Sequence, residues 1–224
     1  PVVDRMLEAL PGTVMLAGTA LVFTLLYALP AGIISALNRN KWIDYLLRTA
    51  SFVGVSMPSF WLGLVLIYIF GLKLGLVPIA SSRVTPIGVI LPAVTLAVVV
   101  WSKYMRQVRL VILEEMQKDY VIGARARGVS EMKILFGHIL PNAVLPLITI
   151  LGGLIGWLLG GVAVVEMVFS WPGLGNMAVY AITMRDYPLI EGFVLWVALA
   201  YMCVNALVDA SYVLLDPRLK RERA

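Results

Sequence analysis

The sequence predicts an all-α fold: a polytopic membrane helix bundle of about five transmembrane helices with a helical segment on the cytoplasmic side. Of its 224 residues, 61% are hydrophobic and 14% are charged, whereas a soluble domain has roughly 45–50% apolar and 25% charged residues. The mean hydropathy is +0.92. The apolar residues also gather in long runs, and about 20 apolar residues in a helix are enough to cross a bilayer. Both observations indicate an integral membrane protein.

Five apolar runs follow one another along the chain, and we expect them to form a single transmembrane domain over residues 1–224. Proline lies inside four of the runs and is expected to kink those helices. The third run is expected to continue beyond the membrane as a helix that emerges into water. The predicted spans cover residues 13–37, 49–72, 86–113, 139–165 and 189–215, and two long polar segments cover residues 119–142 and 166–188.

The distribution of Lys and Arg predicts the orientation of the spans. Of 18 such residues, 14 lie on one side, in the turn 38–48, the segment 103–133 and the tail 216–224. Because cytoplasmic loops carry the excess of positive charge, we expect residues 119–142 and the C-terminus in the cytoplasm and residues 166–188 outside. Five spans then leave the N-terminus outside, although the first run lacks the basic start and cleavage site of a signal peptide.

Residues 119–142 form the longest polar interruption, and their pattern predicts two short helices. Asp119 is expected to cap the first helix, because its carboxylate can accept hydrogen bonds from free backbone N–H groups. Ala124 belongs to a small apolar face of that helix, and the small residues Ala124 and Gly128 are expected to face a docking partner. Gly128 suits a left-handed stop after it, and Ser130 is expected to cap the second helix. The segment is therefore predicted to be a compact element that docks on a partner.

The basic residues of this segment allow another interpretation. Arg125 and Arg127 occupy the last turn of the first predicted helix, where cations suit the negative end of the helix dipole. Basic residues beside membrane spans also commonly act as orientation signals and as partners of lipid headgroups. The two arginines alone do not distinguish a docking element from a charged membrane surface.

A longer motif favours docking. The run ARARG at residues 124–128, followed by Leu-Pro at 140–141, resembles the EAA loop in permease subunits of binding-protein-dependent ABC importers. Ile122 and Gly123 stand where that loop has its acidic residue and first alanine. In the family, the loop forms a coupling helix that sits in a groove of the cytoplasmic ATPase. The resemblance implies this role for Asp119, Tyr120, Ala124, Arg125, Ala126, Arg127, Gly128, Ser130, Leu140 and Pro141.

The fourth run and the residues after it provide candidates for the transport pathway. Gly152, Gly156 and Gly160 repeat at every fourth residue. Glycines on one face let helices approach closely, so we expect tight packing, either within the subunit or at a subunit contact. Ionisable groups near the hydrocarbon usually face protein or water. We assign Glu166 and Glu191, with the three glycines, to the translocation pathway, and a plain interfacial position of the carboxylates is the alternative.

Four further motifs narrow the resemblance. They are SMPSFW at residues 56–61, EMVFSWPGLG at 166–175, RDYP at 185–188 and LLDPR at 214–218, and they are similar to the peptide- and nickel-type permeases. Trp171, inside the second motif, is expected to be an interfacial anchor. The resemblance implies the first of two permease subunits in an importer of di- or oligopeptides. Importers of nickel, nickel chelates or oligosaccharides are the alternatives.

The resemblance also implies partners and a location. The partners would be a sister permease, two cytoplasmic ABC ATPases, an extracytoplasmic substrate-binding protein and membrane lipid, with no nucleic acid. The location would be the inner membrane of a prokaryote. Relatives begin with one more span, so this chain is expected to lack its first span.

Composition limits the chemistry of the chain itself. One cysteine, Cys203, and one histidine, His138, leave no disulfide and no His/Cys metal cluster. The GxxxxGK[ST] loop is absent, so we expect no cofactor, with ATP bound by partner subunits. An intramembrane enzyme is disfavoured because His138 lies at the membrane edge and Asp209 is the one aspartate well inside a span. A channel or secondary transporter is a further alternative, although no repeated halves are found.

Overall fold

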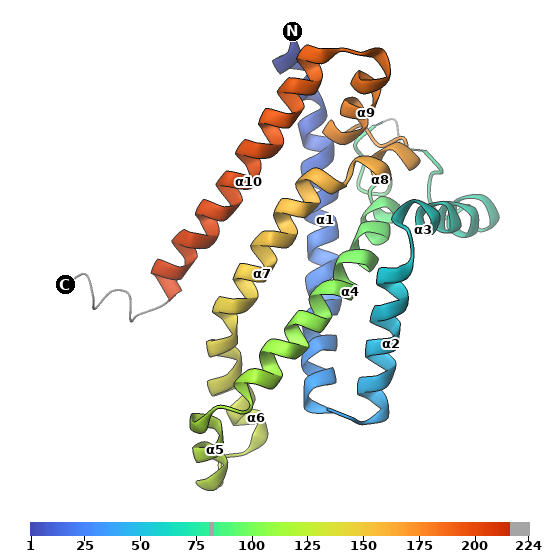
Figure 1. The fold of residues 1–224 in the computed structure, drawn as a ribbon. Coiled ribbons are helices and arrows are strands. Elements are labelled where there is room, and N and C mark those ends of the chain that lie inside the picture. The colour runs from blue at the N-terminus through green and yellow to red at the C-terminus, as the bar shows by residue number, and fades with distance from the viewer. Residues whose placement is uncertain (81–82, 216–224) are drawn as a thin grey trace.

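The computed structural model describes residues 1–80 and 83–215, and within these ranges the chain forms helices and connecting loops without a strand. Five longer helices make the body of the bundle (Figure 1). They are α1 (Val2–Leu37), α2 (Trp42–Ser56), α4 (Ile90–Glu115), α7 (Leu140–Gly161) and α10 (Tyr187–Leu215). An all-α fold is therefore confirmed.

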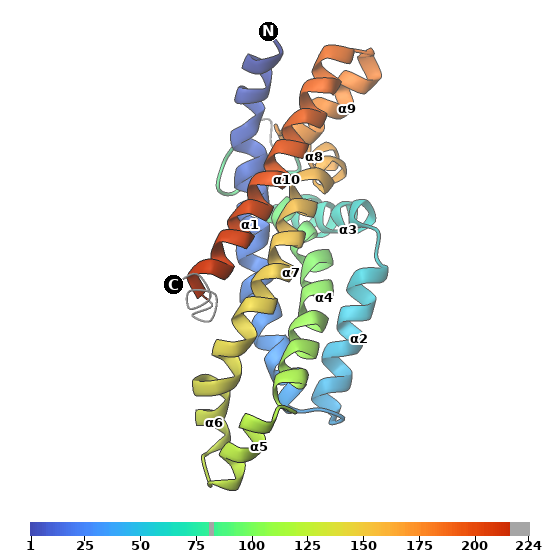
Figure 2. The ribbon, with the colours of Figure 1, turned by 60° about the vertical axis from the view of Figure 1, so that its left-hand side comes forward.

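The shorter helices are α3 (Ser59–Leu66), η1 (Ile67–Lys73), α5 (Asp119–Ala126), α6 (Glu131–Ile134), η2 (Leu135–Ile139), α8 (Ala163–Val168) and α9 (Leu174–Met184). In both views, α5 and α6 lie at one end of the bundle, and the N-terminus and α9 lie at the opposite end (Figures 1 and 2). The turn between α1 and α2 lies towards the α5–α6 end. The predicted basic tail, including most of the LLDPR motif, lies outside the described residues.

The first helix begins earlier than the sequence predicted. α1 starts at Val2 because its polar first turns continue directly into the apolar run. Pro11 and Pro30 lie inside it, and neither ends it. Its largest interface is with α4. Gly32 permits this close approach, since a Cβ there would lie 2.6 Å from the side chain of Val108.

The second predicted span is not a straight helix. The axes of Trp42–Ser56 and Ser59–Lys73 differ by 99°, and the break falls at Met57 and Pro58. Met57 has an extended backbone, with φ −80° and ψ 126°, as expected before a proline, whose ring crowds the preceding residue out of the helical region. The run 49–72 therefore bends near its middle, and α3 with η1 turns away from the direction of α2.

Three helical stretches are long and apolar enough to cross a membrane, and the bent pair would make a fourth. The three are Val2–Leu37, Glu131–Leu158 and Tyr187–Ser211. α4, predicted as the third span, is not among them, because Lys103, Arg106 and Arg109 reduce the hydropathy of its second half. The helix nevertheless runs along the bundle over about 39 Å, at about 1.5 Å per residue for 26 residues.

The core has two parts, and α4 contributes to both. One cluster of buried side chains lies near α5 and α6 and includes Val108, Ile112, Ile134 and Ile139. The other lies near α8 and includes Leu16, Leu96 and Trp171. A single helix thus connects the packing at the α5–α6 end with the packing at the α8–α9 end.

Candidate functional site

The candidate site is the segment from α5 to the start of α7, and the first feature of interest is how α5 begins. Lys118 is the N-cap residue, Asp119 is the first helical residue, and no side chain caps the helix. The prediction that Asp119 caps α5 is therefore wrong by one position. Its carboxylate still lies in the first turn, where negative charge suits the positive end of the helix dipole.

The end of α5 is as predicted. Gly128 has φ +76°, the left-handed region, and the N–H of Gly128 donates to the carbonyl of Arg125 at 2.9 Å. The N–H of Val129 donates to the carbonyl of Ala124 at 3.2 Å. This pair of hydrogen bonds is a Schellman motif, in which a glycine ends the helix at low cost. The predicted stop at Gly128 is confirmed.

A short connection then leads into α6. Ser130 is its N-cap residue, as predicted, although its hydroxyl makes no capping hydrogen bond. Arg125 forms a two-pronged ion pair with Glu131, with Nε at 2.7 Å and Nη2 at 3.0 Å from the carboxylate oxygens. The hydrogen bonds from Arg125 hold the pKa of Glu131 below its usual value. The pair therefore closes the turn between the two short helices.

One face of α5 packs on the bundle itself. Val121 is fully buried and Ala124 is 1% exposed, and both belong to the cluster around Ile134 and Ile139. The small side chain of Ala124 was expected to face a partner. That prediction is wrong, because helical periodicity identifies the apolar face but not what covers it. Ala124 instead lets α5 lie close against its own bundle.

Tyr120 connects α5 with the end of α4. Its hydroxyl donates to Oε2 of Glu115 at 2.7 Å, and the other carboxylate oxygen of Glu115 accepts from Lys118. Burial, together with this carboxylate, raises the pKa of Tyr120 to about 12, so the phenol stays protonated and remains a donor. Asn142, at the start of α7, also interacts with the hydroxyl. The tyrosine thus links α4, α5 and α7.

Three large apolar side chains of the segment are exposed. The exposed fractions are 55% for Ile122, 61% for Met132 and 61% for Phe136. We name these three residues the apolar tip. Ala126, Arg127, Gly128 and Pro141 are also exposed, and Leu140 is partly buried against the core. Exposed apolar side chains on a short helical segment at the end of the bundle are suited to docking on another protein.

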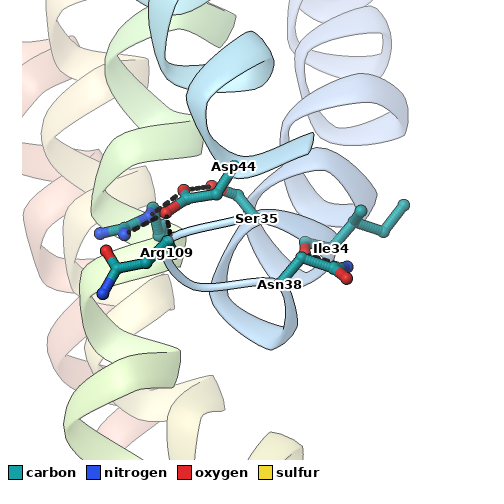
Figure 3. Close-up of polar contacts among 6 residues, drawn as sticks. Ile34, Ser35, Asn38, Asp44 and Arg109 are labelled. Atoms are coloured by element: carbon teal, nitrogen blue, oxygen red, sulfur yellow. Dashed lines mark hydrogen bonds and ion pairs between the residues drawn. The ribbon is translucent and has the colours of Figure 1, made fainter. Parts of the chain in front are cut away.

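A buried ion pair that sequence reasoning missed joins three helices close to this end (Figure 3). Asp44 is 0% exposed and accepts hydrogen bonds from Arg109 Nε and Nη2, both at 2.8 Å. It also accepts from the hydroxyl of Ser35 at 2.6 Å and the backbone N–H of Asn40 at 3.0 Å. One carboxylate therefore ties α1 and α2 to α4. The sequence feature that could have indicated this ion pair is an ionisable residue on each of two apolar helices.

Glu166 is not at a pathway mouth in this structure. It is 0% exposed, and it accepts hydrogen bonds from the hydroxyl of Thr13 at 2.7 Å and the N–H of Asn176 at 2.9 Å. A Cβ on Gly173 would overlap its carboxylate. Glu166 instead fixes the α8–α9 connection to α1.

Trp171 belongs to the same buried connection. Its side chain is 0% exposed, and its indole N–H donates to the carbonyl of Gly12 at 2.9 Å. It is therefore a core residue, and the prediction of an interfacial anchor is wrong. Glu191, the other carboxylate assigned to the pathway, is exposed near the start of α10.

The glycines of α7 pack within the subunit. A Cβ on Gly152 would overlap Val208, and one on Gly156 would overlap the ring of Tyr201, both on α10. Close helix packing is confirmed for these two positions, but in this structure they meet α10 and do not line an opening. Gly160 also lies in α7, and its surroundings are outside the described part of the chain.

The described residues form an all-helical bundle whose long apolar helices could cross a membrane, with short helices at one end, and this is the architecture of a membrane transport subunit. The chain belongs to the family of binding-protein-dependent transport system inner membrane components, whose profile matches residues 28–221. It is therefore an inner-membrane permease of an ABC importer, a multi-pass membrane protein that works with ATPase and binding-protein partners and is not an enzyme.

Two curated relatives cover nearly the whole chain. The glutathione transport system permease protein GsiC of Escherichia coli strain K12 is 38% identical over 220 residues, which are 98% of this chain and 72% of that protein. The probable D,D-dipeptide transport system permease protein DdpB of the same strain is 37% identical over 249 aligned positions, covering 99% of this chain and 73% of that protein.

Solved structures share the fold. An inward-facing MetNI methionine ABC transporter matches with a TM-score of 0.79 and 16% identity, over 96% of this chain and 98% of that chain. An amino acid ABC transporter with histidines matches with a TM-score of 0.68 and 17% identity, over 93% and 92%. At these identities the likeness supports the fold alone.

Proposed function

We propose that this chain forms part of the translocation pathway for di- or oligopeptides and couples it to ATPases through the segment from α5 to the start of α7. The substrate class is supported by the names of GsiC and DdpB, which give glutathione and a D,D-dipeptide as their substrates, and both of these are short peptides. The coupling role is supported above all by the apolar tip, which is exposed on an element held firmly on its inner side. The complete importer would contain this chain, a sister permease, two ATPases and an extracytoplasmic binding protein.

The packing suggests how force passes from an ATPase to the pathway. α5 is held to α4 by the hydrogen bond from Tyr120 to Glu115 and to η2 and α7 by the cluster around Ile139. Both α4 and α7 extend from this end towards the α8–α9 end (Figure 2). A displacement of the segment would therefore move two long helices as rigid bodies, which is a known way of amplifying a local shift. The pathway would open and close as these helices tilt.

The apolar tip provides the experiment. Met132→Asp and Phe136→Asp place charges on exposed positions, so the subunit should still fold and insert. We expect the double variant to lose co-purification of the ATPase and to lose uptake of a labelled dipeptide. Leu76→Asp is the matched control, because Leu76 is 66% exposed and far from α5 in the chain. Retained ATPase and normal uptake in the double variant would show that the tip is not the docking surface.

The uptake assay also separates the substrate classes. A dipeptide should be imported and should be competed by other short peptides. Import of nickel or a nickel chelate without import of dipeptides would contradict the peptide proposal and leave the coupling proposal intact.

A further inference from the structure

A basic pocket lies on the side of the bundle, beside the Asp44–Arg109 ion pair. It has a volume of about 580 Å3 and is enclosed by the α1–α2 turn, α2 and α4. Its lining includes four arginines and one carboxylate: Arg39, Arg48, Arg106, Arg109 and Glu114. Arg109 is already neutralised by Asp44. The other three arginines outnumber the single carboxylate of Glu114, so the pocket has a net positive charge.

Within the described residues, none of these three arginines forms an ion pair with a carboxylate. Arg48 and Arg106 are half-buried, and aromatic rings hold them in place. The guanidinium of Arg106 lies 5.0 Å from the centre of the Phe52 ring, and that of Arg48 lies 5.9 Å from the Tyr45 ring. Such stacking orients a cation without neutralising it, so the two donors remain available to an anion.

An apolar groove continues from the basic pocket. Phe52 lines both the pocket and a groove of about 630 Å3 that follows α2 to the bend at Pro58. The groove is lined mainly by apolar side chains, including Val53 and Trp61. From Arg48 to Ser56, the last residue of α2, the helix rises about 12 Å, at about 1.5 Å per residue. This length is close to the roughly 15 Å of hydrocarbon in one leaflet of a bilayer.

We propose that the pocket and groove bind one anionic phospholipid of the cytoplasmic leaflet. Its phosphate would lie between Arg48 and Arg106, with Arg39 at the edge, and one acyl chain would lie along the groove. The positive charge of the pocket suits the phosphate, and the adjoining apolar groove, which is about as long as one leaflet is deep, suits an acyl chain. A smaller anion would leave the groove empty. Basic pockets between helices on the cytoplasmic side are suited to anionic headgroups. The inference rests on the proposed orientation, and it is independent of the substrate and the ATPase.

The test measures lipid retention by the full-length permease, purified with its partner subunits in detergent. Native mass spectrometry would count bound dioleoyl phosphatidylglycerol as its concentration is raised. We expect Arg48→Gln and Arg106→Gln each to weaken binding by about fivefold, and the double variant by roughly 25-fold. Lys103→Gln is the matched control, because Lys103 lies on α4 and stacks on Trp157 but does not line the pocket. It should bind as the unchanged protein does.

Three further probes decide the nature of the ligand. Dioleoyl phosphatidylcholine should bind more weakly than phosphatidylglycerol, and glycerol phosphate should not compete with it. Val53→Trp fills the groove, so it should weaken the binding of dioleoyl phosphatidylglycerol more than the binding of a short-chain phosphatidylglycerol. Equal retention of phosphatidylglycerol by the double arginine variant would overturn the proposal. Full competition by glycerol phosphate or by a dipeptide would also overturn the proposal, because it would indicate a small-anion site. Binding of the lipid to the isolated permease but not to the complex would overturn it too, because it would indicate that a partner covers the pocket.

Discussion

The buried carboxylate of Asp44 is stabilised by the hydrogen-bond donors that surround it. Two of the four donated bonds come from Arg109, which is 65 positions away in the chain. The sequence does not predict this pair, because nothing in it links a single aspartate on one helix to a single arginine on another. Gly128 was the opposite case, because its left-handed stop depends on local geometry that its own neighbours determine. At the scale of residues, local roles were predictable and long-range partners were not.

The Asp44–Arg109 pair makes a direct prediction about stability. Arg109→Leu leaves a buried carboxylate without its main partner, and we expect it to lower the free energy of unfolding by about 3–5 kcal/mol. Arg109→Lys keeps the charge but not the two-pronged geometry. Its free energy of unfolding should therefore lie between the values for Arg109→Leu and the unchanged protein. Thermal unfolding of the full-length permease in detergent would measure both. An unchanged melting temperature for Arg109→Leu would show that Asp44 does not depend on this partner.

At the scale of elements, the sequence identified most helices but not how each one is oriented or bent. The apolar runs predicted the long helices, and the turn residues predicted the two short helices α5 and α6. Pro58 was recognised as a helix breaker, but the 99° bend depends on packing that the sequence does not show. Ala124 was assigned to the wrong partner for the same reason. Glycine spacing on α7 predicted close packing correctly without naming α10 as the neighbour.

The contact between α7 and α10 can be tested with glycines that lie close together. Gly156→Ala places a methyl group against the ring of Tyr201, and overpacking of this kind typically costs about 1–3 kcal/mol. Gly153→Ala is the control, since nothing lies within 4 Å of a Cβ at that position. We expect lower thermal stability for the first variant only, and partial recovery when Tyr201→Ala is added. Equal effects at Gly153 and Gly156 would indicate that loss of glycine, and not the contact, is responsible.

At the scale of the whole molecule, the structure separates two chemically different ends. The α5–α6 end carries the apolar tip. The basic pocket is lined in part by the α1–α2 turn, which lies towards the same end of the bundle (Figure 1). The opposite end is closed by the buried connection of Glu166 and Trp171 to α1. The charge distribution predicted this division, because the turn 38–48 and the segment 103–133 hold 10 of the 18 Lys and Arg residues. Which end faces the cytoplasm is a prediction from that charge.

Labelling with a thiol reagent that does not cross membranes tests this orientation. Cys203 would first be replaced by alanine, because it is exposed, and a single cysteine would then be introduced at Ser130 or at Thr183, both of which are exposed. Ser130 lies just before α6, and Thr183 lies near the end of α9. If the positively charged end is cytoplasmic, Ser130→Cys should react only in inverted vesicles and Thr183→Cys only in right-side-out vesicles. Reaction of both cysteines from one side would contradict the proposed arrangement of spans, and the reverse pattern would place the apolar tip outside, where no ATPase could dock on it.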